Sequence, residues 1–257
     1  MSVTIEQIKE LREATGVSTM ACKKALEEAG GDYDAAVDLL RKKGAAKAAD
    51  RADRATGNGV IVVKSTDSKA AMIELVCETD FVARGDDFIA LANGLGEKLL
   101  ANELGDNADE IPEVKDAVLK MGENIKVSNM KLVEGDVVGE YVHSNSKIGV
   151  IVELKGGSVE LAKDIAMHAA ATNPSVMSPD EVDQALVDKE KEIWTEQLKQ
   201  EGKPEEIIGK IMMGKEKKFR EESALLKQQF VKDPDKTIEQ LVADAEASLV
   251  GFTRFAI

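Results

Sequence analysis

A pattern of two short apolar strands, helices and a closing strand occurs twice in this sequence, and it restricts the chain to a mixed architecture. Each copy begins with two strand-like runs separated by a polar turn, which is typical of a β-hairpin. A helical period follows, and a further strand-like run closes each copy. The expected strands are 59–64, 69–76 and 125–133 in the first copy, and 137–142, 147–154 and 249–255 in the second. We therefore predict an α+β fold with two related units, each built on a three-stranded antiparallel sheet.

Short sequence matches between the copies support the duplication. The shared dipeptides are Ser68-Lys69 with Ser146-Lys147, and Glu74-Leu75 with Glu153-Leu154. After these strands the first copy has an additional polar segment, 78–86, that contains Phe81. Two interpretations of Phe81 are open. A lone apolar residue in a polar loop commonly packs back onto the core, whereas an exposed aromatic side chain is typical of a wedge that enters a partner.

The second copy contains a different insertion, at residues 179–232. Pro179-Asp180-Glu181 is typical of a helix start, and apolar residues up to Leu198 follow at roughly helical spacing. Gly202-Lys203-Pro204 turns the chain before a return helix that we expect to continue to Leu226. Two helices joined by a short turn predict an antiparallel hairpin. This hairpin is either purely structural or an arm for docking or dimerisation.

The first 55 residues have the periodicity of three short helices. Thr4 and Gln7 have the spacing of a capping box, and we expect the third helix to end near Gly44. The pattern resembles ubiquitin-associated-like modules, which offer a binding surface and no catalytic groups. Met20 lies on that surface or, as is more common for methionine, in the core. The basic segment 41–51 is expected to be a solvated helix end followed by a linker.

Net charge narrows the choice of partners. The chain has 34 basic and 48 acidic residues, a net charge of −14, and most of the acidity lies after residue 55. A surface of this sign binds phosphate backbones and anionic membranes poorly, so we expect no direct nucleic-acid or membrane partner. No apolar run approaches the ~18 residues of a membrane span, and no signal peptide is recognisable. We therefore expect a cytoplasmic protein.

Motifs for catalysis are missing from the sequence. It contains no P-loop, no G-x-G-x-x-G loop after a strand and no G-x-S-x-G elbow. The two cysteines are expected to be buried and reduced, and His143 and His168 lack the spacing of metal ligands. We expect no cofactor, no metal and no bond-making chemistry. Two other classes stay open: a scaffold that only binds partners, and an enzyme that uses Glu78 or Asp80 as an acid or base.

Several motifs carry a resemblance to a known family, and the most specific is the run from Thr79 to Arg84. The other motifs are Thr15-Gly16-Val17, Cys22-Lys23-Lys24-Ala25-Leu26, Ile165-Ala166-Met167-His168-Ala169-Ala170, Gly202-Lys203-Pro204 and Val250-Gly251-Phe252-Thr253-Arg254-Phe255. They occur in order over essentially the whole chain. On these residues the sequence resembles the bacterial translation elongation factor Ts family.

The resemblance implies a guanine nucleotide exchange factor that acts on elongation factor Tu. In the family, the Asp-Phe pair, here Asp80 and Phe81, enters the partner's G domain and disturbs the region that holds magnesium. The residue similar to His143 contacts the partner near its phosphate loop, and the N-terminal module with Met20 docks on the G domain. The implied partner-binding residues are Thr79, Asp80, Phe81, Val82, Ala83, Arg84, His143 and Met20.

The pattern and the resemblance together predict four parts. They are a ubiquitin-associated-like module with a linker (1–55), a first core subdomain (56–136), a second core subdomain (137–178 and 233–257), and a coiled-coil arm (179–232). Arms pair in some family members and not in others, so a monomer, a homodimer and a 2:2 complex through the arm stay open. The sequence ends at Ile257, whereas some members continue with a further helix.

Overall fold

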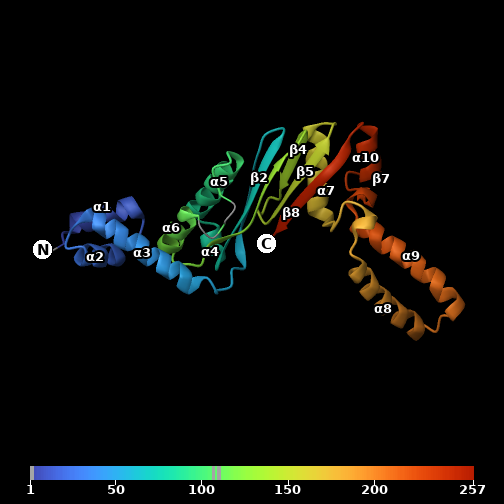
Figure 1. Cartoon of the computed structure of the whole chain (residues 1–257), viewed down its shortest axis with the longest axis horizontal. Coiled ribbons are helices and arrows are strands. Elements are labelled where there is room, and N and C mark those ends of the chain that lie inside the picture. Colours follow the sequence, from blue (N-terminus) through green and yellow to red (C-terminus); the bar gives the residue numbers. More distant parts are fainter. Residues whose placement is uncertain (1–2, 106–107, 109–110) are drawn as a thin grey trace.

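The computed structural model describes residues 3–105, 108 and 111–257. Figure 1 shows an elongated molecule, with three helices at the N-terminal end, two small sheets in the middle and a helical hairpin projecting from the far end. The mixture of helices and small antiparallel sheets confirms the predicted α+β class.

Three helices form the N-terminal end of the molecule: α1 (Ile5–Thr15), α2 (Thr19–Glu28) and α3 (Tyr33–Arg51). The predicted capping box is confirmed, because the Thr4 side chain accepts from the Gln7 backbone and the Gln7 side chain accepts from the Thr4 backbone. The helices enclose a small core of their own, and its fully buried members are Leu11, Cys22, Ala25, Leu26 and Ala36.

The predicted end of the third helix near Gly44 is wrong, because α3 continues to Arg51. Gly44 faces α6 (Pro112–Met121), and a Cβ atom at this position would lie 3.2 Å from Leu119 Cβ. The missing side chain therefore lets the two helices approach closely. Arg51 Nη1 also donates to the Val118 carbonyl oxygen over 3.3 Å. These contacts make the expected linker part of a docked helix.

Each of the two related units contains a three-stranded antiparallel sheet. The first sheet has the order β1 (Asn58–Ser65), β2 (Lys69–Cys77), β3 (Lys126–Glu134), and the second has the order β4 (Val137–Val142), β5 (Ile148–Lys155), β8 (Ser248–Ala256). These bounds confirm the six expected strands to within one or two residues. The pairing register shifts between Glu74 and Leu75 in the first sheet and between Glu153 and Leu154 in the second. The duplicated dipeptide therefore marks the same β-bulge in both units.

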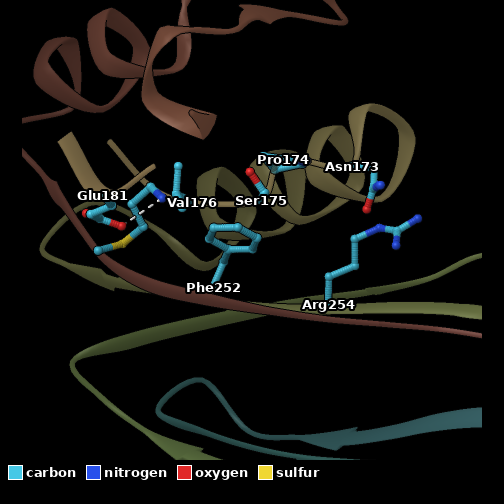
Figure 2. A pocket seen from close by; sticks show the side chains of 8 residues that line it. Asn173, Pro174, Ser175, Val176, Glu181, Phe252 and Arg254 are labelled. Carbon is cyan, nitrogen blue, oxygen red and sulfur yellow. Dashed lines mark hydrogen bonds between the residues drawn. The ribbon is translucent and has the colours of Figure 1, made fainter. Parts of the chain in front are cut away.

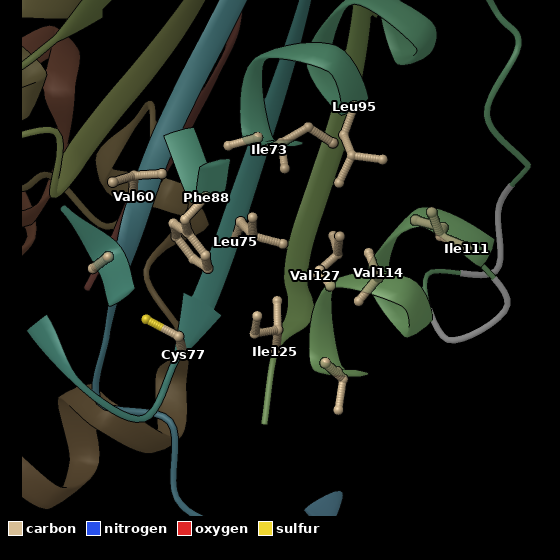
Figure 3. Packing of buried hydrophobic residues seen from close by; sticks show 14 of the residues in the cluster. Val60, Ile73, Leu75, Cys77, Phe88, Leu95, Ile111, Val114, Ile125 and Val127 are labelled. Carbon is tan, nitrogen blue, oxygen red and sulfur yellow. The ribbon is translucent and has the colours of Figure 1, made fainter. Parts of the chain in front are cut away.

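The two sheets pack against each other, and each carries helices on its outer face (Figure 1). Helices α5 (Asp86–Leu100) and α6 cover the first sheet with a core that includes Phe88 and Leu95 (Figure 3). Helix α7 (Val159–Thr172) covers the second sheet. The cluster between the sheets consists of the buried residues Ile61, Ala70, Met72, Val138 and Ile151. The result is a four-layer arrangement of helix, sheet, sheet and helix.

A helical hairpin is inserted in the second unit. It consists of α8 (Gln184–Gln200) and α9 (Glu205–Ser223), and Trp194 packs edge-on against Phe219 with ring centroids 5.8 Å apart. Two details differ from prediction. Pro179–Glu181 is a separate 3₁₀ turn before α8, and α9 ends at Ser223.

The chain after α9 returns to the second sheet. Helix α9 ends at Ser223, because the backbone of Ala224 is extended and the Leu225 N–H donates to the Val176 carbonyl oxygen. A 3₁₀ turn (Leu225–Lys227) and a small hairpin of β6 (Gln229–Phe230) and β7 (Asp233–Thr237) follow, and α10 (Ile238–Asp244) leads into β8. The small hairpin was not predicted, since the β7 sequence is polar and contains Pro234.

Candidate functional site

The segment that distinguishes the first unit is a one-turn helix, α4 (Asp80–Ala83), where the sequence predicted a loop. Thr79 begins this helix, because its backbone is extended and its hydroxyl accepts from the Val82 N–H over 3.4 Å. Asp80 lies in the first turn, where a carboxylate is favoured, and pairs with Arg84 over 3.0 Å. The helix is followed directly by Gly85 and α5.

Phe81 extends from this helix into solvent with 85% of its surface exposed. Its neighbours Val82 and Ala83 pack on the core of the first unit, so the turn is anchored on one side and exposed on the other. The structure therefore supports the exposed interpretation of Phe81 over the interpretation in which it packs back onto the core. An aromatic side chain exposed in this way contributes little to the core and is typical of a contact for a partner.

The base of α4 is held by Glu123, which follows α6. One oxygen of the Glu123 carboxylate accepts from the N–H groups of Glu78 and Thr79, over 3.1 and 3.0 Å. The other oxygen accepts from the Thr79 hydroxyl over 2.6 Å. Nearby, the buried thiol of Cys77 donates to the Thr79 carbonyl, and desolvation together with the Glu123 charge raises its pKa to about 11. This thiol is therefore neutral at physiological pH.

Asn124 and Arg54 hold Glu78 from the opposite side. The Glu78 carboxylate accepts from the Asn124 N–H over 2.7 Å and pairs with Arg54 over 3.4 Å. The Asn124 hydrogen bond, followed by the Arg54 charge, outweighs desolvation and lowers the pKa of Glu78. The buried Asn124 side chain donates to the carbonyls of Ala52 and Arg54. A carboxylate stabilised as an anion in this way is poorly suited to act as a general acid.

His143 lies at the turn between β4 and β5, which confirms the predicted turn. Its ring is exposed, and the Tyr141 hydroxyl lies 3.1 Å from His143 Nδ1. The Ser146 carbonyl in this turn accepts from the Ile61 N–H over 2.7 Å. Asn58, three residues earlier on β1, donates to the Glu78 carbonyl at the base of α4. Strand β1 therefore connects the His143 turn with the base of α4, about 10 Å apart along the strand.

Met20 lies outside this group of residues. It is 65% exposed near the start of α2, so the surface interpretation is supported and the core interpretation is wrong. In Figure 1, α2 is at the N-terminal end of the molecule, separated from α4 by α3 and α6. The predicted site residues therefore form one group along β1 and α4 and a second, separate surface on the first three helices.

Glu123, Asn124 and Arg54 were missed by sequence reasoning. Glu123 is one of 48 acidic residues and lies 44 positions from Thr79, so no local pattern identifies it. Sequence reasoning also missed a surface cleft of about 450 Å³ between the end of α7, the base of the arm and β8 (Figure 2). Arg254 lies at one end of the cleft and Glu181 at the other. Burial lowers the pKa of Arg254, and its Nε has no hydrogen-bond partner among the described residues.

The described residues contain no group of three or more His, Cys, Asp or Glu side chains that is arranged to hold a metal ion. In the same part of the chain, no helix combines the length and apolar character that a bilayer crossing requires. The fold and the exposed Phe81 define an α+β protein whose distinctive feature is an aromatic side chain exposed on an anchored helical turn.

Comparison with known proteins identifies the family. The elongation factor Ts profile matches residues 78–257. The chain is 45% identical to the elongation factor Ts of Teredinibacter turnerae, over all of this chain and 91% of that protein. It is 44% identical to the elongation factor Ts of a Hydrogenobaculum species, over all of this chain and 99% of that protein. The chain belongs to the elongation factor Ts family, and hence to the translation elongation factors.

Proposed function

We propose that this protein promotes GDP release from elongation factor Tu, and that α4 is the element that it inserts into its partner. Family membership supports the partner and the exchange activity. The observation that carries the mechanism is the 85% exposure of Phe81 on a helical turn whose base is fixed by Glu123 and Asn124. Asp80, beside Phe81, supplies a carboxylate to the same insertion.

A wedge of this kind acts by differential binding. A nucleotide with a Kd of ~1 nM is bound by about 12 kcal/mol, and each tenfold weakening requires ~1.4 kcal/mol. Much of that affinity comes from magnesium and the phosphate-binding loop of a GTPase. Phe81 inserted among packed elements of the partner, with Asp80 near the cation, distorts that site and never needs to touch the nucleotide. Coupling is reciprocal, so bound nucleotide weakens the binding of this protein equally.

We assign supporting roles to the remaining predicted residues. His143 provides a second contact near the partner's phosphate loop, because its turn is fixed to β1 close to α4. The helices of the first 55 residues, with Met20, dock on the partner's G domain. The arm (179–232) is a surface for self-association or for a further partner, since Leu186, Ile193, Ile207 and Met213 are exposed along it.

The experiment is stopped-flow release of labelled GDP from elongation factor Tu with Phe81→Ala. We expect the maximal rate to fall about 100-fold, equivalent to ~2.7 kcal/mol, because the wedge side chain is removed. Thermal unfolding should stay nearly unchanged, since Phe81 is 85% exposed. His143→Ala should slow release less.

The matched control is Val250→Ala, which shortens another exposed apolar side chain, on β8, and should leave the rate unchanged. A Phe81→Ala protein with the normal release rate would refute the wedge. If the unmodified protein binds elongation factor Tu tightly and does not accelerate GDP release, it is instead a scaffold that only recruits its partner.

A further inference from the structure

Residues 118–124 contact both the N-terminal helices and the base of α4. The last turn of α6 carries Leu119, which packs against the core of the N-terminal helices, and Val118, whose carbonyl accepts from Arg51. Gly122 ends the helix in the left-handed conformation. Glu123 and Asn124 follow immediately. The same short segment therefore holds the docked helices at one end and the wedge at the other.

The Glu123 carboxylate accepts from three donors at the start of this wedge. The N–H groups of Glu78 and Thr79 precede α4 and have no partner within so short a helix. Both donate to Glu123, as does the Thr79 hydroxyl that caps the turn. Hydrogen bonds to an ionised acceptor are roughly twice as strong as neutral ones. Removing this side chain would leave three donors without their present acceptor.

Asn124 links the Glu78 side chain to the segment that leads from α3 into β1. Its N–H donates to the Glu78 carboxylate, and its side chain donates to the carbonyls of Ala52 and Arg54, which lead from α3 into β1. Lys120, one turn earlier, pairs with Asp87 at the start of α5 over 2.8 Å. The segments before and after α4 are thus both tied to residues 120–124.

We propose that Glu123 is a positioning residue for Phe81, setting the orientation of α4 relative to the docked N-terminal helices. Its carboxylate acts by holding the 78–79 backbone. The proposal rests on the proposed function of Phe81. Its structural half, the restraint of α4 by Glu123, is measurable in the free protein without any partner.

The test compares Glu123→Ala with Glu123→Gln. Alanine removes all three acceptor contacts. Glutamine keeps the two contacts in which its amide oxygen accepts from the N–H groups, and it reverses the third, because its amide nitrogen donates to the Thr79 hydroxyl oxygen. We expect Glu123→Ala to lower the maximal GDP-release rate about tenfold, with less than about a threefold change in the half-saturating concentration. Glu123→Gln should retain most of the rate. Glu113→Ala is the control, since Glu113 lies on the same α6 and pairs with Lys98 away from α4.

Hydrogen exchange of residues 77–85 in the free protein provides the independent readout. Glu123→Ala should accelerate exchange at the Glu78 and Thr79 amides, and Glu113→Ala should not. If hydrogen exchange at these two amides is unchanged in Glu123→Ala, the inference is overturned, whatever the release rate of Phe81→Ala. Accelerated exchange with an unchanged release rate, in an assay where Phe81→Ala is slow, would also overturn it and leave the proposed function intact. A normal release rate in Phe81→Ala would refute the proposed function itself, and the positioning role would be lost with it.

Discussion

The two related units share a sheet, a bulge and a covering helix, and they differ in what the chain adds after that common framework. In the first unit, Cys77 is followed by α4 before the covering helix α5 begins. In the second unit, Lys155 is followed almost directly by α7, and the additional residues appear later, as the arm between α7 and β8. Buried side chains of the sheets and covering helices hold the common part together, whereas insertions at its edge carry most of the exposed large apolar side chains of the two units.

The units also differ in where a glycine allows the covering helix to approach the sheet. In the first unit the glycine is on the helix: a Cβ atom at Gly96 would lie 3.5 Å from Val62 Cγ2. In the second unit it is on the strand: a Cβ atom at Gly139 would lie 2.5 Å from both Ala162 Cβ and the Lys163 backbone nitrogen. Val62 and Gly139 are structurally comparable, since they pair with the central-strand residues Ile73 and Val152.

The largest effect on the free energy of unfolding is expected when the second unit receives, at position 139, the valine that the first unit has at position 62. Gly139→Val forces α7 away from the second sheet, because the clash includes backbone atoms that have no alternative rotamer. Overpacking commonly destabilises a core by 1–3 kcal/mol, and we expect a decrease of about 3 kcal/mol in the free energy of unfolding. Urea unfolding followed by circular dichroism measures it.

The reciprocal change, Val62→Gly in the first unit, is the control for Gly139→Val. It removes a half-buried side chain without a clash, so the expected loss is smaller, at about 1–2 kcal/mol. Equal losses in the two variants would show that the close approach at Gly139 is not what distinguishes the units.

Trp194→Ala tests whether the arm folds as a separate addition to the second unit. Trp194 is buried between α8 and α9, against Phe219 and beneath Lys215. Its loss should unfold the arm locally, while the free energy of unfolding of the sheets falls by less than about 1 kcal/mol. Hydrogen exchange measures both, in residues 184–223 and in β2 and β5. Ile193→Ala, at a more exposed neighbouring position, should leave the arm protected. Loss of protection in β2 or β5 would mean that the arm stabilises the whole molecule.

Strands and covering helices were predictable because each one buries a continuous apolar pattern of its own. The packing between the sheets was not predicted. It depends on Gly149, where a Cβ atom would lie 2.5 Å from Ile61 Cγ2. A glycine within a strand also occurs at bulges and tight bends, so the residue type alone does not indicate that a second sheet packs there. The continuation of α3 was hidden for a similar reason, since Gly44 looks like a helix end in sequence and functions as a contact point for Leu119.

The exposed residue of the candidate site was predictable from the sequence, whereas the residues that hold α4 in place were not. Phe81 was conspicuous as an aromatic residue in a polar segment, and its family motif is specific. Glu123 and Asn124 contact α4 from far along the chain, and their residue types are ordinary in a loop. Comparing the two units locates the insertion, whereas only the folded structure reveals which distant side chains hold it in place.

The smallest expected effect concerns pH and again separates the units. His168 on α7 is fully buried, with Nε2 3.0 Å from Gln228 Oε1 and Nδ1 accepting from the Val231 N–H. Gln228 Nε2 donates to the Glu222 carbonyl oxygen, which orients the amide so that Oε1 faces His168. Because an amide oxygen only accepts, His168 has a neutral ring with its proton on Nε2. Burial lowers the pKa of His168, because desolvation disfavours the charged ring and outweighs the hydrogen bond with Gln228.

The direction of the pH effect follows from this lowered pKa. The unfolded chain binds the proton near pH 6.5 and the folded chain only at lower pH, so the free energy of unfolding falls as the pH decreases from 6.5 towards the folded pKa. Urea unfolding at pH 7.5 and 5.0 measures this decrease. His143→Ala, which changes an exposed ring, should retain it, and His168→Leu should reduce it. In the first unit, Lys98 on the covering helix α5 pairs with Glu113 on α6. The hydrogen bond and charge of Glu113 raise the Lys98 pKa, so this position keeps its charge throughout the same pH range. If the free energy of unfolding of His168→Leu falls between pH 7.5 and 5.0 as much as that of the unmodified protein, the pH sensitivity arises outside the second unit's covering helix.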